Sequence, residues 1–97
     1  MTDFRIQAAE AAKRMRKLFP ATPLQRNDHL SNVYDADIWL KREDLSPVRS
    51  YKLRGAFNAM GKQADKDVFV CASAGNHAQG VAYVCRHLQK KGVIFMP

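Results

Sequence analysis

The chain has 97 residues, of which 46% are hydrophobic and 26% are charged, and its formal net charge is +7. This length allows one small domain of ordinary globular composition, and no apolar run approaches the roughly 20 residues that span a bilayer. The positive charge would suit a nucleic acid, but no aromatic residues alternate with the basic ones to stack on bases. We therefore expect neither a membrane nor a nucleic-acid partner.

The N-terminal third is predicted to contain one amphipathic helix and one short strand. Its apolar residues recur at helical spacing, at Phe4, Ala8, Ala11, Met15 and Leu18. Pro20 is predicted to end this helix. Residues 27–34 are polar and are predicted to form a loop or an irregular hairpin. Residues 36–41 are predicted to form a short strand.

A second helix is predicted to begin behind Ser50, which we expect to act as its N-cap. Its apolar positions again follow helical spacing, at Leu53, Ala56, Phe57, Met60 and Ala64. Gly55 in its interior indicates that something approaches the backbone closely. Lys52 falls in the first turn, where the helix dipole and partial burial would both disfavour an ammonium group. Lys52 is thus either a surface lysine with a solvated amine or a lysine used for covalent chemistry.

The last third is predicted to be one βαβ unit. Residues 68–72 form an apolar, β-branched run typical of a buried parallel strand, and residues 93–96 form a second one. Between them lies a helix, which we expect to end at a cap formed by Lys90-Lys91-Gly92. The expected fold class is therefore α/β, an open parallel sheet with flanking helices. One unit supplies only two parallel strands, so we expect an incomplete sheet and a chain that is the N-terminal part of a longer polypeptide.

The stretch Ser73-Ala74-Gly75-Asn76-His77 follows the first of these strands, where open α/β sheets bind ligands. Free backbone N–H groups at the start of the next helix favour a carboxylate or a phosphate. The alternative is a capping loop with Ser73 or Asn76 as the N-cap. His77 is most simply a structural histidine. Because no second His or Cys stands at metal-ligand spacing, we expect no metal site.

The two cysteines, Cys71 and Cys85, are too few for a disulfide scaffold. Both fall on predicted apolar faces. We expect them to be buried, reduced thiols in a cytoplasmic protein.

Three motifs in order resemble those of a known family. They are Lys41-Arg42-Glu43-Asp44-Leu45, Ser50-Tyr51-Lys52-Leu53-Arg54-Gly55-Ala56 and Ala72-Ser73-Ala74-Gly75-Asn76-His77-Ala78-Gln79-Gly80-Val81-Ala82. They resemble the serine/threonine dehydratases, which are pyridoxal-phosphate enzymes of the tryptophan-synthase-β-like fold (fold type II), and are most similar to those of the biosynthetic threonine type. The resemblance implies that residues 1–97 are the N-terminal portion of the cofactor-binding catalytic domain, with no complete second domain.

The resemblance also implies roles for individual residues. Lys52 resembles the lysine that bonds covalently to pyridoxal phosphate, and Tyr51 stands where the family usually has a phenylalanine near the cofactor ring. Asn76 resembles the asparagine that binds the phenolic oxygen of the cofactor, and the loop of residues 73–77 resembles the one that receives the substrate carboxylate. Ala74 stands where related serine racemases carry a proton-transferring serine, so dehydration is expected rather than racemisation.

The implied reaction is the conversion of L-threonine to 2-oxobutanoate and ammonia, the first step of isoleucine biosynthesis, in a homotetramer. An L-serine dehydratase or a catabolic threonine dehydratase of the same fold stays open, as does a non-catalytic basic binding module. The family's phosphate-binding glycine loop is expected downstream of Pro97, so we expect residues 1–97 alone to be inactive. Arg54 is expected either to bind the phosphate or to form an ion pair with Glu43 or Asp44.

Overall fold

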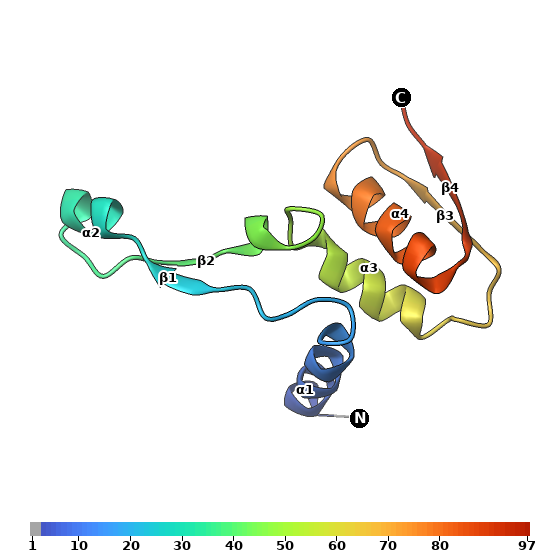
Figure 1. Ribbon diagram of the computed structural model, residues 1–97, viewed down its shortest axis with the longest axis horizontal. Helices are drawn as coiled ribbons and strands as arrows, with labels where there is room; N and C mark the ends of the chain where they lie inside the picture. Colours follow the sequence, from blue (N-terminus) through green and yellow to red (C-terminus); the bar gives the residue numbers. More distant parts are fainter. Residues whose placement is uncertain (1–2) are drawn as a thin grey trace.

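The computed structural model describes residues 3–97, which form four helices, four strands and one 3-10 turn (Figure 1). In chain order these are α1 (Phe4–Met15), β1 (Leu24–Arg26), α2 (Asp28–Tyr34), β2 (Trp39–Lys41), the 3-10 turn (Glu43–Leu45), α3 (Lys52–Gly61), β3 (Val68–Ala72), α4 (Asn76–Leu88) and β4 (Lys91–Phe95). None of the helices within residues 3–97 has the length and apolar character that crossing a bilayer requires.

The compact part of the molecule consists of α1 and the α3–β3–α4–β4 unit. Strands β3 and β4 are parallel, with a register that runs from Val68 opposite Lys91 to Ala72 opposite Phe95. Helix α4 contacts both strands and packs against α3 on its other side, while α1 packs on α3 (Figure 1). The expected α/β class, a parallel sheet with flanking helices, is confirmed.

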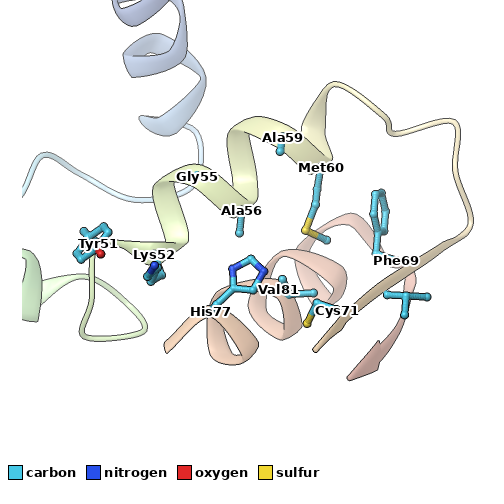
Figure 2. A pocket seen from close by; sticks show the side chains of 11 residues that line it. Tyr51, Lys52, Gly55, Ala56, Ala59, Met60, Phe69, Cys71, His77 and Val81 are labelled. Atoms are coloured by element: carbon cyan, nitrogen blue, oxygen red, sulfur yellow. The ribbon is translucent and has the colours of Figure 1, made fainter. Parts of the chain in front are cut away.

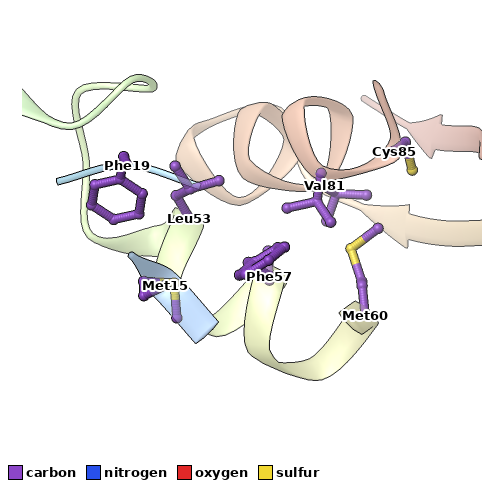
Figure 3. Close-up of a cluster of buried hydrophobic side chains, with 9 residues drawn as sticks. Met15, Phe19, Leu53, Phe57, Met60, Val81 and Cys85 are labelled. Atoms are coloured by element: carbon purple, nitrogen blue, oxygen red, sulfur yellow. The ribbon is translucent and has the colours of Figure 1, made fainter. Parts of the chain in front are cut away.

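The core of the compact part lies mainly between α3 and α4 (Figure 3). Its buried side chains are Met15, Phe19, Leu53, Ala56, Phe57, Met60, Val81, Val84 and Cys85. Four of the apolar positions predicted for α3 are therefore buried, because residues at helical spacing share one face. Ala64 is an exception, since it is exposed and lies beyond the end of α3.

The two parallel strands are less buried than predicted. Val68, Val70 and Phe95 are exposed, whereas the alternate residues Phe69 and Cys71 pack against the core. Successive side chains of a strand point to opposite faces. Helix α4 covers one face of the sheet formed by β3 and β4, and no helix within residues 3–97 covers the other face.

An arm made of β1, α2 and β2, residues 24–41, projects away from the compact part (Figure 1). Its strands are antiparallel, with Leu24 opposite Lys41 and Arg26 opposite Trp39. The radius of gyration is 16.2 Å, well above the roughly 12.5 Å of a compact chain of this length. The projection of the arm accounts for this difference.

The loop predicted for residues 27–34 is wrong, because most of this stretch is helix α2. The side chain of Asn27 caps it, since its Oδ1 accepts a hydrogen bond from the Leu30 N–H at 2.8 Å. Asp28 stands in the first turn, where an acidic side chain suits the helix dipole. Asp35 ends the helix in the left-handed conformation, with a φ of 47°.

Two predicted helix caps are also wrong. The hydroxyl of Ser50 is buried without a hydrogen-bond partner, and the N-cap position of α3 is Tyr51, which makes no side-chain cap. Helix α4 ends at Gln89, which takes the left-handed conformation with a φ of 55°, while Gly92 lies within β4. A left-handed residue lets the chain reverse without a glycine, since the Lys90 N–H then reaches the Cys85 carbonyl at 2.8 Å.

Both cysteines are free thiols, as expected. Cys85 is buried, and burial is the main reason that the pKa of its thiol is raised. Cys71 is only partly buried.

Candidate active site

Lys52 is the first residue of α3, at the position that the sequence predicts. Its side chain is exposed rather than partly buried. The amine lies 5.2 Å from the centroid of the Tyr51 ring, within the range of a cation–π contact. It makes no ion pair with any carboxylate of residues 3–97, so the amine is available to a ligand.

A cavity of about 440 Å³ opens beside Lys52 (Figure 2). Its polar end carries Tyr51, Lys52 and His77, whereas the rest is mainly apolar and is formed by α3, β3 and α4. The volume falls within the range of small-molecule sites, which combine an apolar wall with a few polar groups. Of the predicted site residues, Tyr51, Lys52 and His77 line this cavity. Asn76 does not, although it precedes His77 directly.

Residues 73–77 run from the end of β3 into the first turn of α4, whose N-cap position is Gly75 and has no side-chain cap. The Ser73 Oγ accepts hydrogen bonds from the N–H groups of Gly75 and Ala78, each at 3.2 Å. Asn76 is the first residue of α4 and has an exposed side chain. The backbone N–H groups of Asn76 and His77 find no acceptor within residues 3–97. Two free donors at a helix N-terminus favour an anionic ligand group.

Arg54 forms an ion pair with Glu43, one of the two partners that the sequence left open. Its Nε and Nη2 atoms donate to the Glu43 carboxylate at 2.7 and 2.8 Å. The Thr22 hydroxyl donates to the same carboxylate at 2.5 Å and accepts from Arg54 at 3.2 Å. The hydrogen bonds from Arg54 are the main reason that the pKa of Glu43 falls from 4.5 to about 2. Asp44 pairs with Arg42 instead, at 2.8 Å.

This ion pair ties the first turn of α3 to the segments that precede it. The Arg54 guanidinium also lies over the Phe19 ring, 5.1 Å from its centroid, and the Lys41 amine donates to the Thr22 carbonyl. Arg54 does not line the cavity beside Lys52. Within residues 3–97 it braces the chain around Lys52.

Gly55, expected to mark a close approach to the backbone, does not mark one within residues 3–97. A Cβ atom added there would meet nothing within 4 Å. The close approach is instead at Gly80 in α4, where an added Cβ would lie 3.4 Å from backbone atoms of Lys52 and Leu53. Gly80 was not predicted to have this role from its sequence position. A glycine in the interior of a helix was the available signal.

Comparison with known proteins places the chain among pyridoxal-phosphate enzymes. The family model described as "Pyridoxal-phosphate dependent enzyme" matches residues 15–97. The chain is 61% identical over 80 residues to an L-threonine dehydratase biosynthetic IlvA of Bacillus subtilis, covering 78% of this chain and 19% of that protein. It is 52% identical over 91 residues to the protein of that name from Staphylococcus aureus, covering 91% of this chain and 22% of that protein.

A solved structure is also similar, that of the processed form of threonine deaminase isoform 2 from Solanum lycopersicum. The TM-score is 0.73 and the identity 40%, covering 80% of this chain and 22% of that one. The chain thus spans about a fifth of the length of the relatives that it matches. The match over residues 15–97 includes all three motifs of the sequence, and the chain therefore belongs to the family of pyridoxal-phosphate dependent enzymes.

Proposed function

We propose that this chain is the N-terminal portion of the catalytic domain of a threonine dehydratase, which converts L-threonine to 2-oxobutanoate and ammonia in isoleucine biosynthesis. The observation that carries the proposal is the unpaired amine of Lys52 at the polar end of a cavity of about 440 Å³ that His77 also lines, together with the free backbone N–H groups of Asn76 and His77 at the start of α4. The names of the relatives support the choice of threonine. We further propose a cytoplasmic homotetramer that acts on a free amino acid and binds neither nucleic acid nor membrane.

The residues around the cavity fit pyridoxal phosphate. An amine without a carboxylate partner can bond to an aldehyde carbon, and the adjacent Tyr51 ring offers an apolar surface for an aromatic ligand. When bound, the cofactor supplies an electron sink for the pair released as the substrate Cα–H bond breaks.

Each candidate site residue would have its own role in this reaction. Lys52 would hold the cofactor covalently, and its free amine would take the proton from the substrate Cα. Asn76 donates a hydrogen bond from its side-chain amide to the phenolic oxygen of the cofactor. The free N–H groups of Asn76 and His77, together with the rest of the loop of residues 73–77, bind the substrate carboxylate.

Ala74 favours dehydration over racemisation. Racemisation needs a second proton-transfer group on the face of the substrate opposite Lys52. Ala74 lies on the loop of residues 73–77, and its methyl group cannot give or take a proton. Elimination of the β-hydroxyl therefore becomes the outcome that Lys52 alone can support.

The test is the replacement Lys52→Ala in the full-length protein. Ammonia release from L-threonine should fall by on the order of a thousandfold or more, because the covalent attachment and the base are both lost. The visible absorption of a lysine-bound cofactor should disappear, while the circular dichroism spectrum should be unchanged because the Lys52 side chain is exposed.

Lys66→Ala is the matched control, since Lys66 is an exposed lysine on the loop after α3. It should keep both the absorption and the activity. Parallel rates with L-serine distinguish a serine dehydratase from a threonine dehydratase. Undiminished ammonia release by Lys52→Ala would contradict the assignment.

A further inference from the structure

Helix α4 approaches the first turn of α3 at Gly80. A Cβ atom added at Gly80 would lie 3.4 Å from the carbonyl carbon and oxygen of Lys52 and 3.4 Å from the amide nitrogen of Leu53. All three are backbone atoms, which cannot turn aside as the end of a side chain can. A single methyl group at Gly80 would just reach contact distance from this backbone, whereas a larger side chain would extend past it and push one helix away from the other.

The surrounding packing allows little of this movement to be absorbed. Leu53 and Val84 are fully buried, and Val81, the neighbour of Gly80, is 5% exposed. Protein interiors are packed as densely as crystals of small molecules, so they transmit strain rather than absorb it. A displacement of α4 relative to α3 at Gly80 should therefore also move the candidate site residues on the two helices.

Both of these helices carry candidate site residues at this crossing. Lys52 contributes two of the backbone atoms that Gly80 meets. Asn76 lies four residues before Gly80, which is about one turn along the same helix. The contact at Gly80 thus links Lys52 to the N-terminal turn of α4, which contains Asn76 and His77.

We propose that Gly80 is a positioning residue, whose lack of a side chain sets the spacing between Lys52 and the loop of residues 73–77. The proposal rests on the proposed function, since that function requires both elements to contact one cofactor and its substrate. Reacting groups must be held within about 0.5 Å of their productive positions. The spacing at Gly80 determines whether Lys52 and Asn76 reach the same ligand.

The other glycines of the described chain provide the contrast. An added Cβ at Gly55, Gly61 or Gly75 would meet nothing within 4 Å. At Gly92 in β4 it would lie 3.0 Å from the Cys85 Sγ, which is a side-chain atom of α4. Gly92→Ala therefore disturbs the packing of the same helix without a contact to Lys52, and it is the matched control.

The experiment compares Gly80→Ala, Gly80→Val and Gly92→Ala in the full-length protein. The affinity of each apoprotein for pyridoxal phosphate is measured from the visible absorption of the lysine-bound cofactor, and its unfolding temperature by circular dichroism. Gly80→Ala should weaken cofactor binding about threefold, since its methyl group meets the α3 backbone at the limit of ordinary contact, and Gly80→Val about a hundredfold, as expected for a misplacement approaching 1 Å. The cofactor affinity of Gly92→Ala should stay within about twofold of that of the unmutated protein, although its unfolding temperature should be no higher than that of Gly80→Ala.

Two outcomes would overturn the role of Gly80. One is cofactor binding by Gly80→Ala that is no weaker than cofactor binding by Gly92→Ala. The other is a loss of binding that simply follows the unfolding temperature in all three variants, because that result describes a merely structural glycine. If Gly80→Val does not fold, the pair Gly80→Ala and Gly92→Ala decides. Failure of the unmutated full-length protein to bind the cofactor would instead contradict the proposed function.

Discussion

The compact part has a buried apolar core, whereas the arm has none and leaves several large apolar side chains exposed. In the compact part Leu53 and Val84 are completely buried, while Leu24, Tyr34 and Trp39 of the arm are each more than half exposed. Within residues 3–97 the arm is therefore organised by strand pairing, a helix cap and ion pairs, and the compact part by packing. The Arg54–Glu43 ion pair lies at the junction of the two regions, where the chain passes from the arm through the 3-10 turn to α3.

The largest effect on stability is expected in the core of the compact part. Leu53→Ala should lower the free energy of unfolding by about 3 kcal/mol, because it removes a fully buried side chain and leaves a cavity. Urea denaturation of the full-length apoprotein measures this change. Leu53→Met keeps most of the side-chain volume and should lower the free energy of unfolding by less than about 1.5 kcal/mol. Equal losses in the two variants would show that the lost side-chain volume is not the cause of the destabilisation.

An intermediate effect is expected at the junction of the two regions, and it should depend on pH. The pKa of Glu43 is about 2 in the folded chain against an ordinary value of 4.5, chiefly because of Arg54. The folded state thus favours the carboxylate. Its stabilising contribution should be present above pH 4.5 and should disappear as the pH falls towards 2.

The variant Glu43→Gln isolates this contribution. It should lower the free energy of unfolding of the full-length apoprotein by about 2 kcal/mol at neutral pH, and the difference from the unmutated protein should shrink with acidification. Asp44→Asn is the control, because the ion pair of Asp44 with Arg42 is more exposed to solvent and should contribute little to stability. A pH-independent difference for Glu43→Gln would rule out the ion pair as its cause.

The smallest effect is expected within the arm. Asn27→Ala removes the side-chain cap of α2 and should lower the stability of that helix by about 1 kcal/mol. Because the arm makes few contacts with the compact part, the loss should be local, as faster hydrogen exchange of the α2 amides. Asn32→Ala, at an exposed position within α2, should leave this exchange unchanged or slower, since alanine favours helix. Unchanged exchange in Asn27→Ala would show that another interaction holds α2.

The accuracy of the sequence-based predictions differs between the same two regions. In the compact part, the apolar face of α3 and the order β3, loop, α4, β4 follow from periodicity and were predicted correctly. In the arm, α2 was mistaken for a loop, because a helix of 7 residues with many polar side chains shows little periodicity. The available signal was Asn27 as a capping residue followed by Asp28 in the first turn.

The sequence by itself determined the family of this protein, the position of Lys52 at the start of α3 and the residues that share the buried face of that helix. Such features depend on motifs and on neighbours three or four residues apart. Only the tertiary structure decided that Arg54 pairs with Glu43 rather than Asp44, and that Gly80 rather than Gly55 marks the close approach. Both depend on how segments distant in the chain meet, and local sequence spacing does not specify that geometry.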